Sequence, residues 1–188
     1  NLGVIAIVVG DDTSTISAEN TLKTLQSLEK IAQSTDVPII MHYEQNSKDV
    51  KRSEVDAEIY SAISCLSILL SGENLELDSK DIEHWLRYNK VQGGRGHLSL
   101  LQIVATADHL NDVRGVLSLA SLYTSPDIQH VQTDADYHTD GYVDLAHIDL
   151  DQIHFVIGIN GIADISTKIR NRVNEMLEAR EARVTTSR

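Results

Sequence analysis

The feature that most constrains the fold is a continuous apolar run at the start of the chain, residues 2–9 (LGVIAIVV), which stops at a Gly-Asp-Asp turn. An apolar run without polar alternation is typical of a strand that is covered on both faces of a parallel sheet. Apolar residues then recur with helical spacing over 17–33, and a second short apolar strand follows at 37–41. Strand, helix and strand in this order predict a βαβ unit and therefore an α/β fold.

A long helix is predicted over residues 51–72. Its apolar positions are three or four residues apart and cover much of its girth: Val55, Ile59, Ile63, Leu66, Ile68, Leu69 and Leu70. A helix with so wide an apolar surface is typically central and covered on several sides. Cys65, the single cysteine, lies on this helix, and we interpret it as a core residue rather than a nucleophile.

A second α/β lobe is predicted after the glycine cluster at 93–96, which we interpret as a flexible connector. The pattern predicts a strand at 98–105, a helix at 112–123, strands at 141–145 and 153–159, a helix at 164–181 and a polar tail at 183–188.

The composition excludes several classes of protein. The chain has 16 Lys and Arg against 28 Asp and Glu, a net charge of −12, which argues against direct partnership with nucleic acid or a membrane surface, because both are polyanions. No apolar run approaches the roughly 18–20 residues that a membrane-spanning helix needs. One cysteine provides no disulfide framework, which favours a reducing compartment.

Phosphate-binding motifs are absent from the sequence: neither Gly-x-x-x-x-Gly-Lys-Ser/Thr nor Gly-x-Gly-x-x-Gly occurs. Histidines and aspartates gather between His130 and His154, and imidazole with carboxylate suits zinc or manganese. None of these residues has the spacing of a helical metal site, so we interpret the segment as a solvated strand face and expect no metal of its own.

An acidic pair, Asp78 and Asp81, stands at the start of a short helix that contains Trp85. Asp78 can cap that helix while Asp81 projects from its first turn. Two carboxylates on an exposed loop can also orient a water for attack on a phosphate. Because the chain contains no phosphate-binding motif, a catalytic role requires the substrate to be held by another subunit.

Several stretches, in the same order along nearly the whole chain, resemble the phage-encoded tubulin-like proteins of the tubulin/FtsZ superfamily. They are Val8-Val9-Gly10, residues 21–25, Pro38-Ile39-Ile40 with Tyr43 and Asn46, residues 77–82 with Trp85, residues 117–119 with Leu122-Tyr123, and residues 151–157.

The resemblance implies a tubulin/FtsZ-like α/β fold divided into consecutive parts. These are the C-terminal part of a Rossmann-like GTP-binding domain (1–50), the central helix (51–72), the catalytic loop with its following helix (73–90), a C-terminal α/β domain (97–182) and a tail (183–188). The rest of the GTP-binding domain, with its glycine-rich signature loop, is expected before Asn1, so this chain alone is expected to be inactive.

The same resemblance implies a GTPase that polymerises head to tail into filaments, which centre phage DNA in the cytoplasm of an infected bacterium. Asp81 is the expected catalytic residue and Asp78 its partner, and both act on GTP that the neighbouring subunit binds. Asn46 and Asp56 are the expected contacts to guanine, and Mg²⁺ is expected to accompany GTP or GDP. The alternative function is a non-hydrolysing tubulin-like fragment or a domain that caps filaments.

Overall fold

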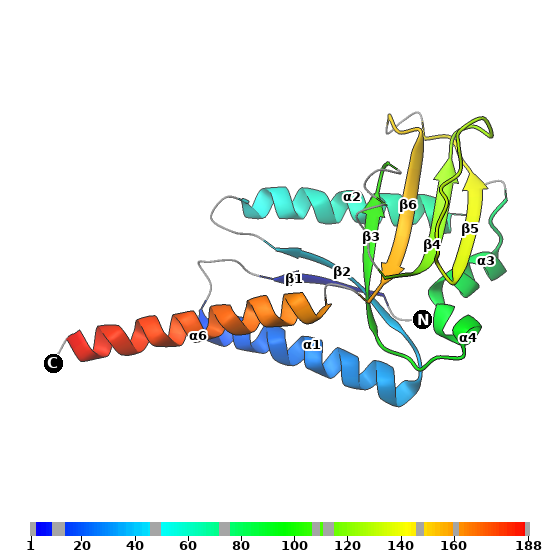
Figure 1. The fold of residues 1–188 in the computed structure, drawn as a ribbon. Helices are drawn as coiled ribbons and strands as arrows, with labels where there is room; N and C mark the ends of the chain where they lie inside the picture. The colour runs from blue at the N-terminus through cyan, green and yellow to red at the C-terminus, as the bar shows by residue number, and fades with distance from the viewer. Residues whose placement is uncertain are drawn as a thin grey trace.

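A computed structural model of the protein describes residues 3–8, 14–45, 50–71, 76–106, 110, 115–145, 149–159 and 162–186. In chain order the elements are β1 (Gly3–Val8), α1 (Thr15–Thr35), β2 (Ile39–Gln45), α2 (Arg52–Leu70), α3 (Ser79–Leu86), α4 (Tyr88–Gln92), β3 (Leu98–Val104), β4 (Val116–Tyr123), β5 (Tyr137–Tyr142), β6 (Gln152–Gly158) and α6 (Ile162–Thr186) (Figure 1). The predicted α/β class is confirmed.

The strands form one six-stranded sheet in the order β1-β2-β3-β6-β4-β5. β1, β2 and β3 are parallel, as the predicted βαβ unit requires for its first two strands. β6 is antiparallel to both of its neighbours, β3 and β4, and β4 is parallel to β5. The β2–β3 pairing joins the strands that precede the central helix α2 to the strands that follow it, in one sheet.

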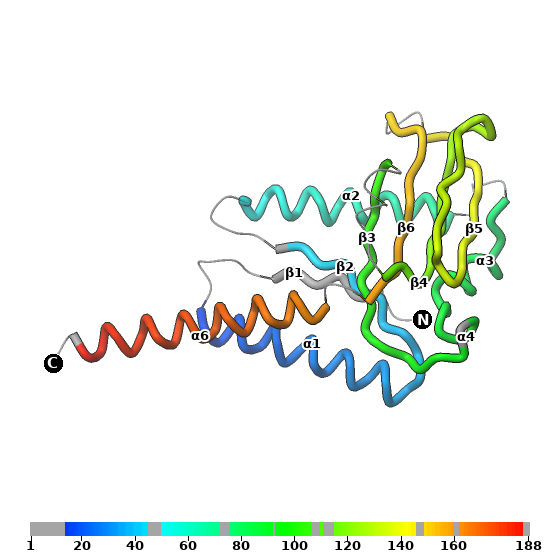
Figure 2. The backbone as a smooth tube through the Cα atoms, viewed as in Figure 1, coloured from blue at the N-terminus to red at the C-terminus, as the bar shows by residue number. Residues whose placement is uncertain are grey.

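Helices cover the sheet on both faces. On one face, α2, α3 and α4 pack over β3, β4 and β6 around a core that includes Leu69, Trp85 and Phe155. On the other face, α1 and α6 pack over β2 and β3 around Leu25, Met41 and Ile169. Figure 2 shows α6 running alongside α1 and projecting beyond its start. The acidic pair belongs to the α2–α3 face.

The buried face of α2 differs from the predicted stripe. Its buried residues are Val55, Ala62, Cys65 and Leu69. Ile63 and Leu70, which the prediction placed on the stripe, are 45% and 55% exposed. Cys65 is a core residue, as predicted, and burial raises the pKa of its thiol. From Ala62 onward, the buried positions Ala62 and Leu69 lie one residue before the predicted Ile63 and Leu70. Apolar residues flank the buried face on nearly every turn of this helix, so spacing alone does not identify that face.

The predicted helix at 112–123 is wrong. Residues 116–123 form the strand β4, and residues 112–114 lie outside the described residues. Leu, Ala and Ser in this segment carry no period-two pattern because β4 is buried on both faces, with Leu119 and Leu122 in different cores. The last helix also extends to Thr186, so residues 183–186 are helical rather than a tail.

The glycine cluster is a packed junction rather than a flexible connector. Asp36, in a left-handed conformation at the end of α1 (φ 54°), accepts the Gly96 backbone N–H at 2.9 Å and pairs with the Lys90 ammonium at 2.5 Å. The hydrogen bond from Lys90 is the main cause that lowers the pKa of Asp36. This side chain therefore links the end of α1 to α4 and to the start of β3.

Gly96→Ala is expected to destabilise the protein by about 1–3 kcal/mol, the usual cost of overpacking. A Cβ atom at this position would lie 2.5 Å from both the Ala32 carbonyl oxygen and the Val37 nitrogen, and backbone atoms cannot move aside cheaply. Urea denaturation measures the change. Gly94→Ala is the matched control, because the nearest atom to its Cβ would be 3.9 Å away. Equal midpoints for the two variants would contradict a packed junction at Gly96.

Candidate functional site

The acidic pair is held in place by the anchoring of α3 to the sheet. Trp85 is buried, and its indole N–H donates a hydrogen bond to the Phe155 carbonyl of β6 at 3.1 Å. The two rings also meet edge to face, with centroids 6.2 Å apart. An eight-residue helix is marginal by itself, so this contact and the surrounding core determine where the first turn of α3 lies.

Asp78 and Asp81 form a reciprocal capping box at that first turn. The Asp78 carboxylate accepts the backbone N–H groups of Lys80 at 2.7 Å and Asp81 at 3.1 Å. In return, Asp81 Oδ2 accepts the backbone N–H of Asp78 at 3.1 Å. The predicted capping role of Asp78 is therefore confirmed.

Backbone hydrogen bonds favour the ionised form of the Asp78 carboxylate. The backbone hydrogen bonds from Asp81 and Lys80 lower the pKa of Asp78, because they stabilise its charged form. Asp78 is exposed and Asp81 is half-buried. Each carboxylate oxygen has two lone pairs, so these bonds leave acceptor capacity for a water or a cation.

One contact to the pair is not signalled by any local sequence pattern. The Tyr137 hydroxyl, on β5, donates a hydrogen bond to Asp81 Oδ1 at 3.3 Å. Tyr137 is 56 residues away from Asp81 along the chain, and no local motif relates the two. Only the packing of α3 against β4 and β5 brings them together.

The structure separates the expected guanine contacts from the acidic pair. Asp56 is exposed in the second turn of α2, whereas α3 follows the other end of that helix (Figure 1). At a rise of 1.5 Å per residue, the helix carries Asp56 about 20 Å from its own C-terminal end. Asn46 lies outside the described residues. Asp56 and the acidic pair therefore do not form one site within a subunit.

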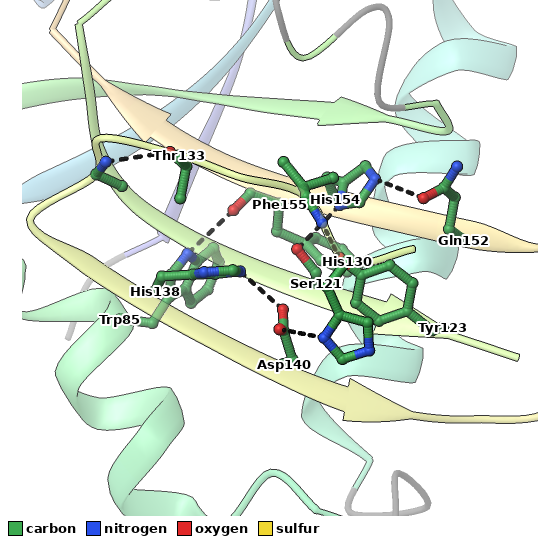
Figure 3. A network of polar contacts seen from close by, with 12 residues as sticks. Trp85, Ser121, Tyr123, His130, Thr133, His138, Asp140, Gln152, His154 and Phe155 are labelled. Atoms are coloured by element: carbon green, nitrogen blue, oxygen red, sulfur yellow. Dashed lines mark hydrogen bonds and ion pairs between the residues drawn. The ribbon is translucent and has the colours of Figure 1, made fainter. Parts of the chain in front are cut away.

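The histidine-rich segment is a polar network rather than a solvated strand face (Figure 3). Asp140, on β5, contacts His130 Nδ1 at 2.9 Å and His138 Nε2 at 2.7 Å. Burial opposes the ionisation of Asp140, but its contacts with the two histidines outweigh this and lower its pKa. The ring of His130 also stacks on Tyr123 with centroids 4.4 Å apart. The network ties the segment before β5 to the sheet.

His154, on β6, is the buried member of this network. It is fully buried, and its two ring nitrogens bond Ser121 Oγ at 2.9 Å and Gln152 Oε1 at 3.2 Å. An amide oxygen only accepts, so Nε2 carries the proton and Nδ1 accepts from Ser121. Burial lowers the pKa of His154 to about 4, and the neutral ring therefore prevails at neutral pH.

His154→Gln is expected to flatten the acid side of the stability profile. Between its pKa of about 6.5 in the unfolded chain and about 4 in the folded protein, the unfolded state binds the extra proton. Stability is therefore lost as the pH falls through this window, by at most about 1.4 kcal/mol per pH unit from this group. Denaturation midpoints between pH 7 and pH 4 measure the effect.

The control for this prediction is His84→Gln, because the His84 side chain is exposed on α3. It should leave the slope of stability against pH as in the wild type. A slope for His154→Gln as steep as that of the wild type would contradict a neutral, buried His154.

The described residues offer two carboxylates at the start of α3 rather than a cluster of metal ligands. Among the described residues no group of three or more His, Cys, Asp or Glu side chains could hold a metal ion. Asp78 and Asp81 supply two exposed or half-exposed carboxylates, which suit a water or a Mg²⁺ ion carried by a phosphate group.

Comparisons with known proteins agree with this architecture. Residues 77–163 match the family described as "Phage tubulin-like protein, C-terminal domain". The phage tubulin-like protein of Pseudomonas phage phiKZ is 30% identical over 177 residues, which is 94% of this chain and 54% of that protein. The chain thus spans about half the length of this curated relative. In the part of the chain that the structure describes, no helix is long and apolar enough to cross a membrane.

Two solved structures extend the likeness to the fold. The phage tubulin PhuZ with GDP is 26% identical and superposes with a TM-score of 0.87 over 95% of this chain and 58% of that one. A protofilament of TubZ from bacteriophage PhiKZ is 29% identical, with a TM-score of 0.86 over 94% and 56%. In sequence and in fold, the chain is similar to the phage tubulin-like proteins, and residues 77–163 match the C-terminal domain of that family.

Proposed function

We propose that the full-length protein hydrolyses GTP and polymerises head to tail, and that the acidic pair of one subunit completes the hydrolysis site of its neighbour. The observation that carries this proposal is the pair's position. Two carboxylates are held by reciprocal hydrogen bonds at the first turn of α3, at the opposite end of α2 from Asp56. A nucleotide held near Asp56 is out of reach of Asp78 and Asp81 of the same subunit, whereas head-to-tail stacking brings the two ends together.

The relatives support assembly and nucleotide binding. One was solved as a protofilament and another with GDP. For this protein we propose the same self-association, with GTP or GDP as the bound nucleotide and Asn46 and Asp56 as contacts to its base. The filaments would act in the cytoplasm of an infected bacterium and centre the phage DNA there.

The chemistry assigned to the pair is the orientation of a water. Asp81 is the half-buried member and has both oxygens hydrogen-bonded, so its carboxylate has a defined direction in which to accept a water proton. Asp78 holds the backbone of the turn and adds negative charge beside it. A Mg²⁺ ion bound with the nucleotide would offset the repulsion between these carboxylates and the phosphates.

Asp81→Asn in the full-length protein is expected to lower GTP turnover by about 10²-fold or more, the usual loss when a general base is removed. Asparagine retains an oxygen that can accept the Asp78 N–H, so the capping box survives while the charge is lost. Assembly with GTP should persist and the filaments should become long-lived. Phosphate release and pelleting measure the two effects separately.

Glu83→Gln is the matched control, because Glu83 is an exposed carboxylate on the same helix whose partner is Arg87 at 3.3 Å. Its turnover should stay close to that of the wild type. Turnover of Asp81→Asn within a factor of two of the wild type would reject the catalytic role. A wild-type protein that bound filament ends but released no phosphate would instead favour the non-hydrolysing capping function.

A further inference from the structure

We propose that Tyr137 is a positioning residue for GTP hydrolysis, which it serves by fixing the orientation of the Asp81 carboxylate. This inference rests on the proposed function of Asp81. The contact between the two side chains joins the edge strand β5 to the first turn of α3, which are distant in the sequence.

The two oxygens of Asp81 have different donors. Oδ2 accepts the backbone N–H of Asp78 at 3.1 Å, and Oδ1 accepts the Tyr137 hydroxyl at 3.3 Å. A carboxylate bonded through one oxygen can still rotate about its Cβ–Cγ bond, because that torsion has a broad minimum. A second donor on the other oxygen restricts this rotation, so the free lone pairs of Asp81 point in one direction.

Tyr137 is itself held on two sides. Its backbone lies in register with Ser118 of β4, and its ring packs against the core beneath α3. The ring of His84, one turn after Asp81 on α3, meets the Tyr137 ring edge to face with centroids 5.7 Å apart. The hydroxyl is thus carried by a strand and a ring contact rather than by a free loop.

The alternation of β5 gives Tyr137 this role. Its neighbours on the strand, His138 and Asp140, belong to the polar network on the opposite face of the sheet. Tyr137, Thr139 and Gly141 share the face toward α3, where a Cβ at Gly141 would meet the Leu77 side chain at 2.8 Å. Thr139 hydrogen-bonds the Tyr137 side chain, and Tyr137 in turn presents its hydroxyl to the acidic pair.

The Tyr137 hydroxyl is the donor of this bond. Burial, followed by the negative charge of Asp81, raises the pKa of Tyr137, so the phenol keeps its proton and donates it to the Asp81 carboxylate. Because the proposed role of the hydroxyl is to orient Asp81 rather than to bind GTP, its removal should slow turnover and leave the affinity for GTP unchanged.

The test is Tyr137→Phe in the full-length protein, which removes the hydroxyl and keeps the ring. We expect turnover at saturating GTP to fall about tenfold, because a misdirected carboxylate loses part of its effect on the water. The KM for GTP should stay as in the wild type, because the proposed role of the hydroxyl is to orient Asp81 and not to bind GTP. Assembly and the melting temperature should stay as in the wild type.

Tyr142→Phe is the matched control. It removes a phenolic hydroxyl from the same strand, but that hydroxyl bonds His130 Nε2 at 2.9 Å instead of Asp81. Its turnover and its KM for GTP should equal those of the wild type.

The outcomes separate this proposal from the proposed function. Slow turnover of Asp81→Asn together with normal turnover of Tyr137→Phe would overturn the role of Tyr137 alone. Slow turnover of Tyr137→Phe with a raised KM for GTP or a lowered melting temperature would also overturn it, since the loss would then lie in nucleotide binding or in stability. Normal turnover of Asp81→Asn would overturn both.

Discussion

The anchoring of α3 by Trp85 is the interaction on which the candidate site depends. The indole is buried in the main core, bonds the Phe155 carbonyl of β6 and packs edge to face on the Phe155 ring. A buried Trp combines a large apolar area with one directional donor, so it fixes both the depth and the rotation of the helix that carries it. The acidic pair at the start of α3 therefore occupies a fixed place relative to the sheet.

Structural and chemical roles coexist at Asp78 and Asp81. Each carboxylate accepts two hydrogen bonds. Asp78 accepts the backbone N–H groups of Lys80 and Asp81, and Asp81 accepts the backbone N–H of Asp78 and the Tyr137 hydroxyl. These contacts stabilise the turn, and they also fix the direction of the carboxylates, which a water-orienting role requires. The same contacts can therefore cap the helix and hold the carboxylates for the proposed catalytic role.

The two faces of the C-terminal strands have separate tasks. The face toward α3 is largely apolar and supports the acidic pair. The opposite face carries a network of histidines around Asp140 and a neutral, buried His154. Because the described contacts of that network lie within β4, β5, β6 and the segment before β5, it contributes to the architecture of the sheet.

The sequence by itself determined those parts of the protein whose signals are local. Residues a few positions apart account for the apolar run of β1, the spacing of α1, the long central helix and the Asp78–Asp81 cap. Short stretches in the same order along the chain were sufficient to indicate the resemblance to the phage tubulin-like proteins. Only the tertiary structure decided the rest. β4 is a strand because both of its faces are covered, which erases the period-two pattern, and Gly96 is a junction because the end of α1 packs against it. The Tyr137–Asp81 contact also required the tertiary structure, because its partners are 56 residues apart and meet only when α3 packs on the sheet.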